Sequence, residues 1–118
     1  GQPWLAVNPN YKAINVQEVL ANPDSIFYTY QKLVQIRKEN SWLIRADFEL
    51  LETTDKVFAY IRKDGNRRFL VVANLSNEEQ DMTVEGTVKS VLIENTVAQE
   101  AFEKQILVPW DAFCVELL

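Results

Sequence analysis

The stretch KVFAYIRKDGNRRFLVVAN, residues 56–74, decides the fold of this chain. Two runs rich in β-branched and aromatic residues, 56–62 and 68–74, are each typical of a β-strand. Lys63-Asp64-Gly65-Asn66 separates them, and its Asp-Gly pair favours a tight hairpin turn because both residues accept a positive φ angle. The stretch therefore predicts two strands that pair antiparallel.

Further short apolar runs lie on both sides of this hairpin, separated by polar and turn-forming residues. Together with the hairpin they predict a compact antiparallel β domain. The additional strands are expected at 48–51, 81–85, 88–94, 105–108 and 113–118.

Two helices are expected before the strands. The spacing of apolar residues predicts a short helix over 15–21. Asn22-Pro23-Asp24 ends it and begins the next helix, because Asn caps a helix, Pro suits the first turn and a carboxylate is stabilised there. The second helix is expected over 24–39. Its apolar stripe contains Ile26, Phe27, Tyr30, Leu33 and Val34.

The composition excludes several classes of function. The 118 residues carry a net charge of −5 with scattered basic residues, which argues against a nucleic-acid partner. No apolar run approaches the length of a membrane span. The absence of histidine excludes Ser-His-Asp and Cys-His nucleophile systems and His-based zinc sites. The three glycines lack the spacing of dinucleotide or phosphate loops. We therefore expect no catalytic, cofactor-binding or metal-binding residue in this chain.

Two pairs of acidic residues are the first candidates for a catalytic role. Glycoside hydrolysis needs two carboxyl groups on facing walls of a cleft. The pairs in this chain are instead expected on the solvent side of a strand and in a turn. They are Asp47/Glu49 and Glu78/Glu79.

Basic and aromatic side chains are the next candidates. Arg67-Arg68 could hold an anion, but we expect a solvated strand start beside the hairpin. Trp42 and Trp110 could stack on sugar rings, but we expect them to plug the edge of the core. The single cysteine, Cys114, is expected to be a small buried hydrophobe, which fits a reducing cytoplasm.

The segment PWLAVNPNYKAINVQEVLANPDSIFYTYQKLVQIRK, residues 3–38, resembles the end of the catalytic domain in bacterial α-glucosidases of glycoside hydrolase family 13. The strands at 57–62 and 70–76 resemble the first long strands of the C-terminal β domain of the same enzymes. The motifs that carry the first resemblance are Pro3-Trp4, Val7-Asn8, Asn10-Tyr11, Ile14-Asn15-Val16, Asp24-Ser25, Tyr28, Tyr30-Gln31-Lys32-Leu33 and Arg37-Lys38.

The resemblance implies an α+β chain. Residues 1–40 would be the last loop and helix of a (β/α)8 catalytic barrel, and 41–118 a C-terminal, β-sandwich-like antiparallel domain that packs on that barrel. The catalytic Asp, Glu and Asp of the family would all precede Gly1, which suggests an internal fragment that is inert alone. The asparagines of 8–15 are expected to satisfy the loop's own backbone. Relatives place a Gly near Ile44-Arg45-Ala46-Asp47, so this junction is expected to turn differently.

Within that group, QPWLAVN (2–8) and FYTYQKL (27–33) look most like trehalose-6-phosphate hydrolases. The resemblance then implies a retaining, cytoplasmic enzyme that cleaves trehalose 6-phosphate to glucose and glucose 6-phosphate, with a small carbohydrate as its substrate. Two alternatives stay open. One is a dextran glucosidase or oligo-1,6-glucosidase that cleaves α-1,6-glucosidic bonds, and the other is a stand-alone β-rich carbohydrate-binding module.

Overall fold

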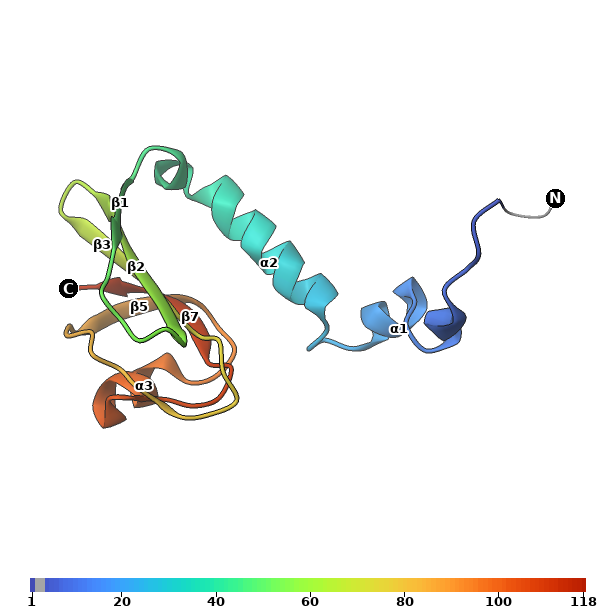
Figure 1. The fold of residues 1–118 in the computed structure, drawn as a ribbon. Coiled ribbons are helices and arrows are strands. Elements are labelled where there is room, and N and C mark those ends of the chain that lie inside the picture. The colour runs from blue at the N-terminus through green and yellow to red at the C-terminus, as the bar shows by residue number, and fades with distance from the viewer. Residues whose placement is uncertain (2–3) are drawn as a thin grey trace. The chain divides into compact units, whose positions relative to one another are not determined.

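The computed structural model of the chain describes residue 1 and residues 4–118, so the Pro3 of the first motif lies outside the described residues. The chain forms two compact units, Gly1–Ile36 and Arg37–Leu118. Figure 1 shows the order of the elements, with helices in the first unit and the strands in the second. Each unit is described by itself below.

The first unit is made of short helical elements with almost no core. It contains the 3-10 helix η1 (Pro9–Lys12), α1 (Val16–Ala21) and most of α2 (Ile26–Glu39). Ser25 is its only buried residue among those described. The expected helices at 15–21 and 24–39 are confirmed, although α2 begins later than predicted.

Polar side chains hold the turns of this unit. The side chain of Asn15 accepts a hydrogen bond from the Glu18 amide at 3.0 Å and donates to the carbonyls of Tyr11 and Lys12. Asn8 accepts from the Asn10 amide at 3.2 Å. The asparagines thus satisfy the loop's own backbone, as expected, and α1 has a side-chain cap at its first turn.

The delayed start of α2 has a local cause. Asn22 accepts a hydrogen bond from the Asp24 amide at 2.9 Å, and its carbonyl accepts from the Ser25 amide at 3.1 Å. Asn22, Pro23 and Asp24, which were expected to begin the helix, therefore form a turn instead. Ser25 then donates through its hydroxyl to the Val19 carbonyl at 2.7 Å, which ties the start of α2 to α1.

The second unit is built on a five-stranded antiparallel sheet with the strand order β1-β2-β3-β7-β5. A two-stranded sheet of β4 and β6 lies outside it, and 3-10 helix η2 (Ser41–Ile44) precedes β1. The strands are β1 (Asp47–Leu50), β2 (Val57–Asp64), β3 (Arg67–Asn74), β4 (Gln80–Asp81), β5 (Val88–Glu94), β6 (Ile106–Leu107) and β7 (Ala112–Leu117). Six of the expected strands are present, with β6 shorter than predicted. The strand expected at 81–85 is largely wrong, because β4 shares only Asp81 with it and residues 82–85 form no strand.

The hairpin of β2 and β3 is confirmed, but its turn differs from the expected one. Asp64 pairs with Arg67, so the two turn residues are Gly65 and Asn66 rather than Asp64 and Gly65. Of these, only Gly65 has a positive φ, at 60°. A glycine with positive φ at the first turn position is typical of a type II′ turn. The turn therefore lies one residue later in the chain than the Asp-Gly pattern predicted.

Helix α3 (Ala98–Lys104) is an α-helix that the sequence analysis misses, as it also misses the 3-10 helices η1 and η2. Ala98 and Ala101 are buried on its inner face, and Lys104 pairs with Glu100 one turn earlier at 2.5 Å. Gln105 ends the helix in the left-handed region with a φ of 53°. The run 98–104 is only seven residues long, and just Ala98, Ala101 and Phe102 carry its apolar signal, which is too short a pattern to predict a helix.

The core lies on one face of the five-stranded sheet, between the sheet and α3, which Figure 1 shows beside the strands. Alternate residues of β2 and β3 point into it, as a strand's period of two requires. Its largest fully buried apolar members from the strands are Leu70, Val72, Leu107 and Val115.

The opposite face of the sheet is also apolar. Phe48, Phe58 and Tyr60 form an aromatic group on this face. The centroid of the Tyr60 ring lies 5.1 Å from that of Phe48 and 5.5 Å from that of Phe58. Phe48 is 58% exposed and Phe58 is 45% exposed. An antiparallel sheet that faces water on one side normally carries polar residues there. This face therefore exposes more apolar surface than a sheet face that contacts only water.

Candidate functional site

Trp42 lies on η2 and stacks on Phe69 of β3, with ring centroids 3.7 Å apart and an interplanar angle of 14°. Its indole nitrogen donates to the Asn40 side chain at 2.8 Å. Phe69 is only 1% exposed although it points to the outer face of the sheet. Trp42 thus plugs the edge of the core, as the sequence analysis expects.

Arg62 fixes the same junction from β2. Its guanidinium donates to the carbonyls of Leu43 and Ala46 at 2.8 Å and to that of Asp47 at 3.2 Å. These bonds hold the turn between η2 and β1, where the glycine expected from the relatives is absent. A planar group with five donors suits three converging carbonyls.

Arg67 holds the protein's own carboxylate rather than a foreign anion. It forms two hydrogen bonds with Glu116, at 3.0 and 3.1 Å, and Lys89 donates to the same carboxylate at 2.9 Å. Its guanidinium also lies 4.6 Å from the centre of the Phe69 ring. Arg67 and Arg68 begin β3 beside the hairpin and are both exposed, so the expected solvated strand start is confirmed, whereas the pairing of Arg67 with Glu116 was not expected. Sequence spacing could not reveal a partner 49 residues away.

The environment of Glu116 keeps it ionised. Its side chain is 7% exposed, and hydrogen bonds from Arg67 and then Lys89 lower its pKa to about 2. A nearly buried carboxylate with two cationic partners is a structural ion cluster, since its charge is already compensated.

The acidic pairs lie toward solvent, as expected. Glu49 pairs with Lys63 across β1 and β2, and Glu78 pairs with Lys56. In each pair the lysine lowers the pKa of the carboxyl group, mainly through the hydrogen bond. Among residue 1 and residues 4–118, no group of three or more Cys, Asp or Glu side chains is placed to hold a metal ion.

Cys114 is half-buried on the outer face of the sheet, so it is less buried than the sequence analysis expects. Burial raises the pKa of its thiol to about 11. The thiol is therefore protonated at neutral pH and is a poor nucleophile.

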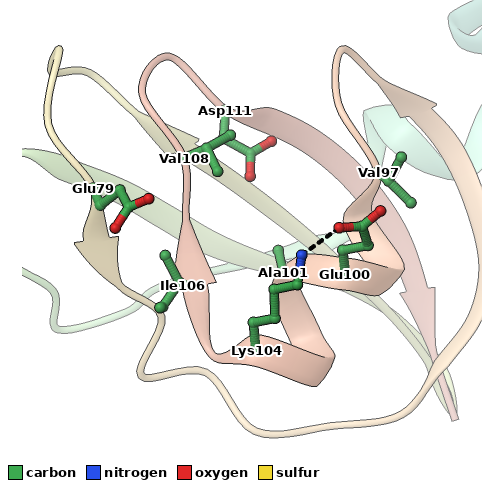
Figure 2. A pocket seen from close by; sticks show the side chains of 8 residues that line it. All are labelled: Glu79, Val97, Glu100, Ala101, Lys104, Ile106, Val108 and Asp111. Carbon is green, nitrogen blue, oxygen red and sulfur yellow. Dashed lines mark hydrogen bonds and ion pairs between the residues drawn. The ribbon is translucent and has the colours of Figure 1, made fainter.

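A hollow of about 200 Å³ lies between α3 and the segment that follows β6. Figure 2 shows Glu79 and Glu100 at opposite ends, Asp111 above and Lys104 below. The remaining lining residues are Val97, Ala101, Ile106 and Val108. No sequence motif marks this group, because its members come from separate elements.

Asp111 and Asn74 are the buried polar residues that support this region. Asn74 is 1% exposed, and its amide donates to the carbonyls of Glu78 and Val108 at 2.8 and 2.9 Å. Asp111 is 2% exposed and accepts a hydrogen bond from the Thr96 hydroxyl. Sequence reasoning missed both, since a single Asn or Asp beside a turn is an ordinary feature.

Trp110 departs from expectation. It is 59% exposed, so it does not plug the core. Its backbone has a φ of 61° and is held by hydrogen bonds from its amide to the Ser76 carbonyl and from the Asn95 side chain to its own carbonyl.

Comparison with known families assigns both parts of the chain. Residues 1–46 match the model of the α-amylase catalytic domain, and residues 57–110 match the model of the α-amylase SusG C-terminal domain. The chain belongs to the α-amylase family. As a member of this family, glycoside hydrolase family 13, it consists of the end of a catalytic domain followed by a β-rich C-terminal domain. The boundary expected between residues 40 and 41 stays a prediction.

Relatives of known activity in the α-amylase family support the same assignment. The chain is 87% identical over all of its 118 residues to a glucan 1,6-α-glucosidase of Streptococcus pneumoniae serotype 4. It is 50% identical over 98% of its length to a glucan 1,6-α-glucosidase of Streptococcus dysgalactiae subsp. equisimilis. A trehalose-6-phosphate hydrolase of Bacillus subtilis is 32% identical over 99% of the chain. The chain spans 22% of the length of each.

Solved structures of the α-amylase family have the same fold. Trehalose-6-phosphate hydrolase of Bacillus licheniformis matches 99% of this chain and 22% of its own, with a TM-score of 0.84 and 32% identity. Trehalulose synthase of Pseudomonas mesoacidophila MX-45 matches 100% of this chain and 22% of its own, with a TM-score of 0.86 and 30% identity. In the part of this chain that is described, no helix is both long and apolar enough to cross a membrane.

Proposed function

We propose that this chain is the C-terminal region of a longer α-glucosidase that hydrolyses α-1,6-glucosidic bonds in glucans. The observation that carries the proposal is the 87% identity to a glucan 1,6-α-glucosidase over the whole chain. A second enzyme with the same name is 50% identical. This reading is one of the alternatives left open by the sequence analysis.

Hydrolysis of trehalose 6-phosphate, which the sequence analysis ranks first, is now the second candidate. It is favoured by the 32% identity and the TM-score of 0.84 to the enzyme of Bacillus licheniformis. However, the trehalulose synthase resembles this chain equally well in the same region. Because enzymes with different names share the fold of this region, the fold does not discriminate between the candidate substrates.

The role proposed for this chain is structural: it supports a catalytic domain and takes no part in bond cleavage. The first unit leaves its large apolar side chains in contact with water, and a soluble domain of that kind needs a partner surface. These side chains are Trp4, Leu5, Val7, Tyr11, Ile14, Val16, Leu20, Ile26, Phe27, Tyr30, Leu33 and Val34.

The outer face of the β sheet supports the same role. Phe48, Leu50 and Phe58 are all more than 40% exposed on adjacent strands. We infer that the rest of the catalytic domain, in the full-length protein, covers apolar surface of both units. A stand-alone binding module is less favoured, because the first unit alone would expose most of its apolar residues. Cytoplasmic location also stays a prediction.

The test compares the full-length protein with this chain alone. Both are assayed on isomaltose and on trehalose 6-phosphate. We expect the full-length protein to release glucose from isomaltose and this chain to be inactive on both substrates. Hydrolysis of trehalose 6-phosphate alone would overturn the substrate assignment. Turnover by the isolated chain would overturn its structural role.

A further inference from the structure

The segment between α2 and β1 belongs to the catalytic domain by sequence and to the β domain by structure. The match to the catalytic domain extends to residue 46, whereas the second compact unit begins at Arg37. Residues 40–46, which contain η2, are therefore the end of the catalytic-domain sequence but lie in the same unit as the β sheet. The contacts that hold this segment on the sheet thus also join the two parts of the sequence.

A row of three side chains crosses the outer face of the sheet next to this segment. Phe69 of β3 is the direct cross-strand partner of Arg62 on β2 and of Glu116 on β7. Side chains that are opposite each other in register lie on the same face and interact. Arg62 donates to carbonyls of the segment, and Phe69 stacks on the ring of Trp42. Two members of the row therefore contact the segment directly.

Arg67 connects the third member of the row, Glu116, to the aromatic stack. Its guanidinium lies 4.6 Å from the ring centroid of Phe69 and 5.9 Å from that of Trp42, which is close enough for a cation–π interaction with each ring. Its two hydrogen bonds to the Glu116 carboxylate, at 3.0 and 3.1 Å, fix the plane of the guanidinium. The position of the cation against the rings therefore depends on Glu116.

An irregularity in β5 fixes Glu116 from the other side. Val88 pairs with Leu117 and Ser90 pairs with Glu116, so Lys89 is an extra residue in the strand. Such a β-bulge changes the direction of the side chains around it. Here the Lys89 ammonium donates to Glu116 Oε1 at 2.9 Å, and the Ser90 hydroxyl lies 3.5 Å from Oε2. The carboxylate is therefore held from both strands that flank β7.

We propose that Trp42, Phe69, Arg67 and Glu116 form a latch that holds the end of the catalytic-domain sequence on the β domain, so that the opening of residues 40–46 is controlled from β7. Glu116 is a positioning residue in this latch, because it acts on Trp42 through Arg67 and the Phe69 ring. The half-buried stack of two rings gains the attraction of the cation only while the carboxylate holds the cation in place. The latch does not depend on which glycosidic bond the full-length protein cleaves.

The experiment measures amide hydrogen exchange in the full-length protein. The amides of Leu43, Arg45 and Ala46 report on the segment, because each donates a backbone hydrogen bond within it. We expect Glu116→Gln to raise their exchange rates about three- to tenfold, the scale of one hydrogen bond. Ala101→Gly is the matched control. It weakens the core from α3, on the inner face of the sheet, and should leave these rates unchanged.

Combining Glu116→Gln with Trp42→Ala separates a latch from two independent contacts. Once Trp42 is removed, Glu116→Gln should raise the exchange of the segment little further. Arg62 still binds the carbonyls of the segment in this background, so the rates remain measurable.

Lys89→Ala is a milder variant, because the Lys89 side chain is 51% exposed, and it keeps the test decisive if Glu116→Gln does not fold. It should raise the exchange of residues 41–46 by less than Glu116→Gln does. Unchanged exchange of this segment in both single variants would overturn the latch. Fully additive effects of Glu116→Gln and Trp42→Ala would also overturn it, as would an equal rise in Ala101→Gly.

Discussion

At the scale of single residues, Glu116 shows how an anion is accommodated in the β domain. Its carboxylate is 7% exposed and receives hydrogen bonds from Arg67 and Lys89. Breaking such bonds costs about 1.5–3 kcal/mol when one partner is charged. We therefore expect Glu116→Gln to lower the free energy of unfolding of the β domain by that amount at neutral pH, measured by urea denaturation.

The pH dependence follows from the direction of its pKa shift. The folded pKa of Glu116 is about 2, below the ordinary value of 4.5. Between these values the unfolded chain binds more protons, so stability is complete above about pH 4.5 and is lost as the pH falls toward about 2. Glu116→Gln should flatten the curve of stability against pH in this window. Glu103→Gln is the control, and an equally steep curve in both variants would contradict the assignment.

At the scale of elements, the hairpin of β2 and β3 depends on one backbone angle. Gly65 has a φ of 60°, and an added Cβ would meet no atom within 4 Å. The cost of Gly65→Ala is therefore conformational and amounts to about 1–2 kcal/mol. Urea denaturation should show this loss, and Gly65→Asn should show less, because Asn tolerates the left-handed region. Equal losses for Ala and Asn would indicate a steric cause instead.

The junction before β1 is the second element with a testable role. Trp42 covers Phe69, and Arg62 holds the carbonyls that follow η2. We expect Trp42→Ala to raise the hydrogen-exchange rates of 41–46 while those of the β3–β7 pairing change little. Trp42→Phe should restore most of the protection, since it preserves an aromatic stack. Unchanged exchange in Trp42→Ala would show that Arg62 alone fixes the junction.

At the scale of the whole molecule, the two units differ in what holds them together. The second unit has a continuous core, whereas Ser25 is the only buried residue described in the first. Limited proteolysis of the isolated chain should therefore cut within 1–36 first and leave 37–118 resistant. In the full-length protein the same sites should be protected. Early cleavage within the β domain would contradict this division.

The sequence by itself determined the local structure and the family. The alternation in 56–74 and the glycine of its turn predicted the central hairpin, and the helical spacing in 15–39 predicted α1 and α2. These features depend on neighbours a few residues apart, which periodicity detects. The motif string of 3–38 indicated the family, which the matching domain models support.

Only the tertiary structure decided which side chains meet. It placed Glu116 against Arg67, stacked Trp42 on Phe69, buried two alanines of α3 and gathered the acidic hollow below Asp111. It also exposed Trp110, where the sequence predicted burial. Contacts between residues far apart in the chain depend on strand order and packing, and no local pattern encodes them.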